Sequence, residues 1–172
     1  MSDDHLRIGP IAADRYGETY SLIEQIYNST DMMCQAFSAK YPQLADLEAD
    51  VREHQEMPGG VFFVAELAAG LVGYVTVSPQ GLCKLAHTAY LNMGVSEGVR
   101  GRSVGRRLLE SAIAQLQKDG VIEILYLNVR ADNTAAVKLY QSTGFETIAI
   151  LTKDTKFEGK HYDGLLMRKF IG

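Results

Sequence analysis

Between Val95 and Glu110 the chain reads VSEGVRGRSVGRRLLE, a segment rich in glycine and arginine. An apolar, strand-like run enters this segment from Ala89, and an amphipathic helix leaves it. A strand that turns directly into a helix points unpaired backbone N–H groups and the positive end of the helix dipole at one place. Glycine lets the backbone approach a ligand closely. The segment therefore predicts a binding site for a phosphate or pyrophosphate group.

The glycine spacing argues against two common phosphate-binding loops. Gly98, Gly101 and Gly105 do not form the G-x-G-x-x-G pattern of dinucleotide-binding folds. Gly105 is followed by Arg106, whereas an NTP-binding loop continues with Lys and then Ser or Thr. Taken alone, this segment leaves open an ordinary strand-to-helix turn that carries surface arginines.

A second informative segment, residues 127–146, reads LNVRADNTAAVKLYQSTGFE and predicts a strand, a helix and another strand. Gly144 suits the position just after a helix, where the backbone turns left-handed. Helical spacing places four residues on one face of the expected helix: Asn133, Ala136, Val137 and Tyr140.

Together the two segments resemble the acyl-coenzyme A motifs of the GNAT N-acetyltransferase superfamily. Residues 100–105 are similar to its Arg/Gln-x-x-Gly-x-Gly/Ala loop, with Ser103 where glycine is usual. Serine keeps the backbone N–H and is a good helix N-cap, so we expect the anion site to survive this change. The second motif, Asn-x-x-Ala-x-x-x-Tyr followed by Gly-Phe, is matched by Asn133, Ala136, Tyr140, Gly144 and Phe145.

The resemblance covers roughly residues 61–168 and implies the GNAT fold, an α/β fold with a central mixed sheet and helices on both faces. Strands are expected at residues 5–9, 61–67, 71–78, 86–95, 122–130, 145–151 and 162–170, and helices at 14–29, 44–56, 103–118 and 133–142. The stretch 30–41 is expected to be irregular, and a polar loop is expected from Lys153 to Lys160. In the family, the strands corresponding to 86–95 and 122–130 splay apart and admit the pantetheine arm of the cofactor. The closing segment, residues 157–167, resembles the last strand of bacterial members whose substrates are unassigned.

Composition limits the partners of the chain. Its 172 residues, 47% of them apolar and 22% charged, predict one globular domain spanning residues 1–172. The net charge of −4 argues against a nucleic-acid partner, and no run is apolar enough to predict a membrane partner. Cys34 and Cys83 form neither a disulfide framework nor a metal site, and the acidic N-terminus has no apolar signal core. We therefore expect a cytoplasmic protein without a metal, and the sequence leaves a homodimer open.

The resemblance implies acetyl-CoA as co-substrate and Tyr140 as the general acid that protonates the departing coenzyme A sulfur. A phenol suits this role because it is neutral at pH 7 and can donate a proton; a packing role for the ring is the alternative. Asn133 is expected to contact the cofactor, to cap its helix, or both. The residues expected to bind the cofactor are Met93, Val95, Arg100, Gly101, Arg102, Ser103, Val104, Gly105, Arg106, Asn128, Asn133, Ala136 and Tyr140.

The general base is harder to place. Members that acetylate ribosomal-protein N-termini carry a glutamate where this chain has Asn128, and asparagine cannot take a proton from an amine. No Asp or Glu lies between Leu85 and Val95. His87 could act directly or through water, or be a structural histidine at the end of a strand. A water chain held by Tyr90, Asn92 and Asn128 is a further alternative.

The acceptor is expected to contact the region before residue 61. Met32, Met33, Phe37 and Tyr41 are candidate pocket residues there, with core packing as the alternative for each; Tyr90 and Asn92 are further candidates. The expected reaction is acetyl transfer to a primary amine of a small molecule or peptide by direct attack within a ternary complex. The alternatives are an N-terminal acetyltransferase of the ribosomal-protein type, which Asn128 disfavours, and a catalytically weak acyl-CoA sensor.

Overall fold

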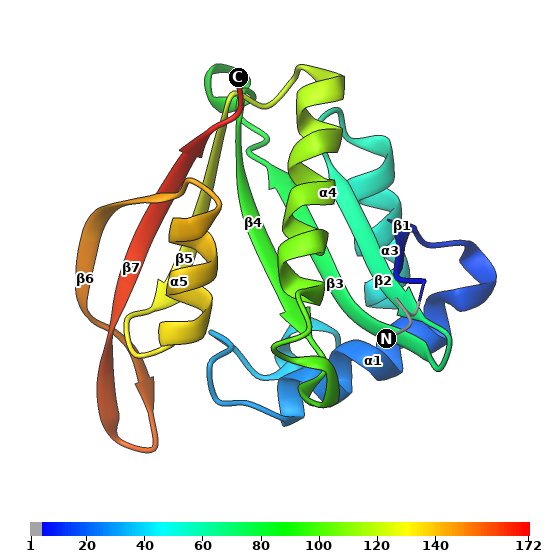
Figure 1. Cartoon of the computed structure of the whole chain (residues 1–172), viewed down its shortest axis with the longest axis horizontal. Coiled ribbons are helices and arrows are strands. Elements are labelled where there is room, and N and C mark those ends of the chain that lie inside the picture. The colour runs from blue at the N-terminus through cyan, green and yellow to red at the C-terminus, as the bar shows by residue number, and fades with distance from the viewer. Residues whose placement is uncertain (1–4) are drawn as a thin grey trace.

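A computed structural model describes residues 5–172 of the chain, and its strands form one mixed sheet (Figure 1). The strand order is β1-β2-β3-β4-β5-β7-β6, and every neighbouring pair is antiparallel except β4 and β5, which run parallel. The strands are β1 (Arg7–Pro10), β2 (Val61–Leu67), β3 (Gly70–Pro79), β4 (Thr88–Val95), β5 (Ile124–Arg130), β6 (Glu146–Phe157) and β7 (Lys160–Phe170). The helices are α1 (Tyr16–Asn28), α2 (Phe37–Lys40), α3 (Leu44–Glu56), α4 (Val104–Asp119) and α5 (Thr134–Ser142).

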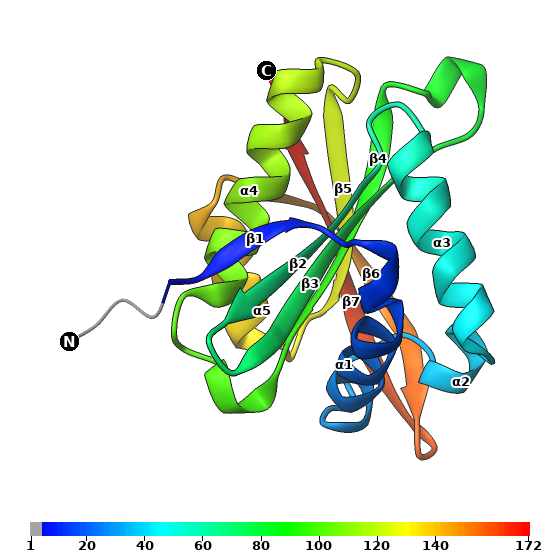
Figure 2. The same ribbon diagram turned by 90° about the vertical axis from the view of Figure 1, so that its right-hand side faces the viewer.

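Helices cover both faces of this sheet, as expected (Figure 2). One apolar core lies under α4 and α5, where Leu108, Leu109 and Leu116 pack against apolar residues of the strands. A second core lies under α1 and α3, where Ile23, Ile26, Leu47 and Val51 are buried against β2 and β3. The predicted α/β fold with a mixed sheet is therefore confirmed.

The strands β4 and β5 stay paired over a short distance only. Thr88, Ala89 and Tyr90 of β4 face Ile124, Leu125 and Tyr126 of β5, and the pairing ends there. Beyond these residues the two strands diverge (Figure 1), which confirms the expected splay in the middle of the sheet. The sheet is therefore open between β4 and β5 on the side where β4 enters the glycine-rich segment.

The expected polar loop from Lys153 to Lys160 is wrong. β6 continues to Phe157 and β7 begins at Lys160, so only Glu158 and Gly159 form the turn of a long hairpin. This hairpin extends beyond the helices (Figure 1), and most side chains of its outer part are exposed. Because water reaches both faces of this outer part, it has no apolar alternation that could predict strands.

Smaller differences concern the ends of elements. A short helix, α2, lies in the stretch expected to be irregular, and 3-10 turns at Ala13–Arg15 and Cys83–Leu85 shorten the elements expected after them. No helix within residues 5–172 is long and apolar enough to cross a membrane. Within the same residues, no group of three or more His, Cys, Asp or Glu side chains is placed to hold a metal ion.

Candidate active site

The glycine-rich segment turns sharply between β4 and α4. Gly101 and Ser103 both have left-handed backbones, with φ of 78° and 61°, and α4 begins at the next residue, Val104. The N–H groups in the first turn of α4 have no partner within the helix. Ser103 stands at the N-cap position, but its side chain makes no capping hydrogen bond, so that expectation is wrong. A good cap residue has extended backbone, which the left-handed turn at Ser103 does not allow.

This left-handed serine leads to a stability prediction. We expect Ser103→Gly to raise the free energy of unfolding by about 0.5–1 kcal/mol, because relief of left-handed strain exceeds the entropic cost of an added glycine. Urea denaturation measures the change. The matched control is Ser96→Gly, since Ser96 has an ordinary φ of −54° and should lose stability on the same substitution. A Ser103→Gly protein that is less stable than the wild type would contradict the assignment of strain.

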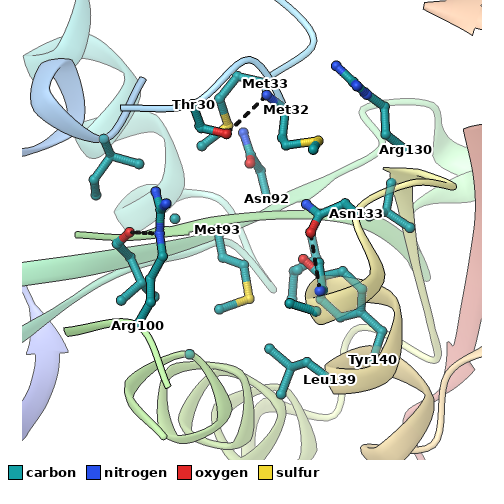
Figure 3. Close-up of a pocket in the computed structure, with 18 of the residues that line it drawn as sticks. Thr30, Met32, Met33, Asn92, Met93, Arg100, Arg130, Asn133, Leu139 and Tyr140 are labelled. Atoms are coloured by element: carbon teal, nitrogen blue, oxygen red, sulfur yellow. Dashed lines mark hydrogen bonds between the residues drawn. The ribbon is translucent and has the colours of Figure 1, made fainter. Parts of the chain in front are cut away.

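One cavity of about 1010 Å³ joins this segment to the opening between β4 and β5 (Figure 3). Its wall combines the end of α1 and the loop after it, β4, the start of α4, the end of β5, α5 and part of β6. The expected site residues that line it are Met33, Tyr90, Asn92, Met93, Val95, Arg100, Gly101, Ser103, Val104, Gly105, Arg106, Asn128, Asn133, Ala136 and Tyr140. The two sequence motifs therefore meet at one cavity, although about thirty residues separate them.

Tyr140 lies on α5 with its ring edge against Phe145, at 5.7 Å between ring centroids. Burial raises the pKa of its hydroxyl to about 12, so the phenol stays neutral at physiological pH. Within residues 5–172 the structure gives this hydroxyl no hydrogen-bond partner, although the residue lines the cavity. The geometry leaves its proton available to a bound molecule.

Asn133 caps α5 and faces the same cavity. Its Oδ1 accepts a hydrogen bond from the backbone N–H of Ala136 at 3.3 Å, drawn as a dashed line in Figure 3. This capping bond leaves the amide nitrogen of the side chain available to a ligand. The structure therefore confirms the expected capping role.

Basic side chains gather around the start of α4. Arg100 donates to Ser29 Oγ at 2.9 Å and to the carbonyl of Val95 at 3.3 Å, which ties the glycine-rich segment to the end of α1. Arg106 donates to Ser142 Oγ at 2.7 Å, which ties α4 to α5. Lys138 of α5 also lines the cavity, as does Ser142. Positive charge beside the N-terminus of a helix suits a phosphate-bearing ligand.

Four expected site residues lie outside the lining of this cavity: His87, Arg102, Phe37 and Tyr41. His87 precedes β4 at the end where β4 and β5 still pair, and its carbonyl accepts the N–H groups of Glu123 and Ile124. Phe37 is buried in the core under α1, with ring centroids of Tyr20, Tyr27 and Tyr41 at 4.9–5.9 Å. Tyr41 is buried in the same core, whereas Met32 and Met33 line the cavity.

Sequence reasoning missed part of the cavity wall. Arg130 at the end of β5 and Asp154 and Thr155 of β6 line it, as do Thr30 and Gln35 of the loop after α1. Arg130 is buried, and its guanidinium lies 3.7 Å from the ring centroid of Tyr162. The sequence signal for Arg130 is a charged residue at the end of a mostly apolar strand. Asp154 has no such local signal, because its position depends on the pairing of β6 with β7.

Comparison with known proteins identifies relatives of this chain. A sequence model of the acetyltransferase (GNAT) family matches residues 26–145. The N-alpha-acetyltransferase RimI of Mycobacterium tuberculosis is 32% identical over 115 residues, which cover 67% of this chain and 69% of that protein. The L-amino acid N-acetyltransferase AaaT of Escherichia coli is 24% identical over 157 residues, which cover 90% of this chain and 95% of that protein.

Solved structures share the fold. A GNAT-family acetyltransferase from Streptococcus pneumoniae superposes with a TM-score of 0.91 at 23% identity, over 98% of this chain and 100% of that chain. The protein yncA of Salmonella typhimurium, whose structure holds its cofactor acetyl-CoA, superposes with a TM-score of 0.82 at 16% identity, over 98% and 95% of the two chains.

Proposed function

The chain belongs to the acetyltransferase (GNAT) family, and we propose that it transfers the acetyl group of acetyl-CoA to a primary amine of a small molecule or peptide. The observation that carries the proposal is the convergence on one cavity of the glycine-rich turn, the gap between β4 and β5, and the neutral phenol of Tyr140. Both N-acetyltransferases matched above carry names that describe amine acetylation. We place the reaction in the cytoplasm, where acetyl-CoA is a metabolite.

Two parts of the cavity wall support binding of acetyl-CoA. The first turn of α4 offers N–H groups to the pyrophosphate, and Arg100 and Arg106 add positive charge beside it. Gly105 lets α4 pack closely, because a Cβ there would lie 3.4 Å from Leu139 Cδ2 and from Met93 Cε. Beyond Tyr90 the backbone of β4 has lost its β5 partner, so the region of Met93 and Val95 can pair with an extended pantetheine arm.

Acetyl-CoA supplies the acetyl group as an activated thioester. Tyr140 donates its proton to the sulfur as the carbon–sulfur bond breaks, while the acceptor nitrogen forms the new carbon–nitrogen bond. The acceptor loses two protons to water, one as its ammonium form becomes the free amine and one as the carbon–nitrogen bond forms. Asn92, Asn128 and Tyr90 line the cavity where that water can be held. Protons and charge then balance without a dedicated carboxylate base, and Tyr140 is reprotonated from solvent.

A second candidate acceptor is the N-terminus of a protein, because the matched relative of 32% identity is named an N-alpha-acetyltransferase. Asn128 counts against this candidate, since it stands where the ribosomal-protein enzymes that the sequence resembles carry a glutamate. A catalytically weak acyl-CoA sensor is the alternative outside catalysis, because the cavity can hold the cofactor whether or not turnover follows.

The test is release of free coenzyme A thiol from acetyl-CoA in the presence of a panel of amines. The panel contains amino acids, amino acid amides, short peptides and diamines. We expect thiol release that depends on the amine and saturates with it. Tight acetyl-CoA binding with no amine-dependent release from any member would contradict the proposed transferase and favour the sensor.

A further inference from the structure

Asp154 reaches the cavity because β6 is irregular at this point. Pairing with β7 jumps from Leu151↔Gly164 to Thr155↔Tyr162, so β6 spans four positions where β7 spans two. Lys153 takes a left-handed backbone with φ of 57°, and its N–H donates to Asp163 Oδ1 at 2.9 Å. A bulge of this kind redirects side chains, and bulges are enriched beside active sites.

The neighbouring strand makes room for the Asp154 carboxylate. A Cβ at Gly164 of β7 would lie 2.4 Å from Asp154 Oδ2, so only glycine leaves space for this side chain. Gly164 pairs with Arg130 at the end of β5. The carboxylate therefore lies over the sheet next to the strand end where the cavity wall passes from β5 to β6.

Asp154 is an exposed side chain at this end of the cavity. Within residues 5–172 the structure gives the Asp154 carboxylate no hydrogen bond and no ion pair. Its neighbour Thr155 also lines the cavity, and its Oγ1 is buried without a hydrogen-bond partner in the described chain. An ionised carboxylate only accepts hydrogen bonds, so a ligand that replaces the water around it must donate them.

One cation of the same cavity wall, Arg130, is already engaged. Arg130 makes four hydrogen bonds to Asp31 and Asp132, at 2.7–3.2 Å, and stacks on Tyr162. Lys160 lies over the same ring but does not line the cavity. A carboxylate on the acceptor would therefore compete with Asp31 and Asp132 for Arg130. It would also be repelled by the carboxylate of Asp154.

We propose that Asp154 binds the ammonium form of the acceptor amine and selects amines that carry no carboxylate beside the amino group. The favoured class is an amino acid amide or a similar amine without a neighbouring carboxylate, rather than a free amino acid. This inference rests on the proposed function, since it concerns the acceptor of the same reaction. It makes Asp154 a specificity-determining residue.

The experiment compares alaninamide with alanine, which share the amine and the side chain and differ in the carboxylate. Thiol release at saturating acetyl-CoA gives kcat/KM for each acceptor in the wild type and in Asp154→Asn. We expect kcat/KM for alaninamide to fall about tenfold or more in the variant, mainly through KM, with little change for alanine. The amino groups of alanine and alaninamide differ in pKa. The ratio of the two kcat/KM values is therefore compared between the wild type and Asp154→Asn at one pH.

Two further variants separate charge from structure. Asp154→Glu keeps the carboxylate and should restore part of the preference for alaninamide. Glu158→Gln removes a carboxylate from the β6–β7 turn, outside the cavity lining, and should leave both acceptors unchanged. Circular dichroism and acetyl-CoA affinity, both expected to be unchanged in Asp154→Asn, show that the fold and cofactor site persist.

The outcomes distinguish the inference from the proposed function. Equal kcat/KM values for alaninamide in the wild type and Asp154→Asn overturn the role of Asp154 and leave amine acetylation standing. A wild-type enzyme that uses alanine in preference to alaninamide also overturns it. If the wild type releases no thiol with any amine of the panel, the proposed function is overturned. The role of Asp154 is then overturned as well, because it rests on that function.

Discussion

Replacement of Gly105 with glutamate is expected to weaken acetyl-CoA binding by about a hundredfold or more while the fold survives. The added carboxylate enters the first turn of α4, where backbone N–H groups are proposed to hold the pyrophosphate. Juxtaposed like charges cost several kcal/mol, and each 1.4 kcal/mol is a factor of ten in affinity. A Cβ at this position already contacts Leu139 and Met93 at 3.4 Å, so the side chain must turn toward the cavity or push these neighbours away.

Isothermal titration calorimetry measures the affinity for Gly105→Glu, and circular dichroism checks the fold. The matched control is Gly98→Glu, which adds the same charge to the same segment at a position where a Cβ meets nothing within 4 Å. Gly98 does not line the cavity, so its variant should bind acetyl-CoA nearly as the wild type does. Unchanged affinity in Gly105→Glu would remove the phosphate-binding role from the start of α4.

The second large effect is expected for Tyr140→Phe, which removes the proton donor and keeps the ring. The turnover number should fall by about a hundredfold or more, the usual scale of general acid catalysis. Acetyl-CoA affinity should change little, because the ring still packs against Phe145. Burial raises the pKa of the hydroxyl to about 12, so wild-type turnover should show no loss from Tyr140 ionisation up to about pH 10.

Steady-state thiol release across this pH range tests the prediction. Tyr16→Phe is the control, because it makes the same chemical change at the start of α1, outside the cavity lining. Full turnover by Tyr140→Phe at every pH would reduce Tyr140 to a packing residue. A fall in wild-type turnover near neutral pH that disappears in Tyr140→Phe would contradict the raised pKa.

Local sequence signals predicted most elements because turn-forming and helix-ending residues lie at the ends of those elements. α3 and β2 begin and end at the residues expected, with Pro58, Gly59 and Gly60 between them. Gly120 and Gly144 follow α4 and α5 in left-handed conformations, as helix-ending glycines do. The outer part of the β6–β7 hairpin, expected as a loop from Lys153 to Lys160, escaped prediction because its strands are stabilised by pairing with each other rather than by an apolar face.

The predictable parts of the cavity wall are those in which the functional residues belong to one continuous sequence motif. The glycine-rich turn, Asn133 and Tyr140 carry recognisable spacing, and the structure brings them to the same wall. The Asp154 end was not predictable, because it needs a bulge, a glycine on β7 and a salt-bridged arginine on β5. The conformation of Ser103 was also missed, since a left-handed turn and a helix cap look alike in sequence.

The measurement that tests the central claim most directly is the mass of the product. The chain is incubated with alaninamide and acetyl-CoA that carries an isotopically labelled acetyl group, and the amine is analysed by mass spectrometry. We expect one labelled acetyl group on the amine for each thiol released. Thiol release with labelled acetate and unmodified amine would show hydrolysis rather than transfer, and would contradict the proposed acetyltransferase activity.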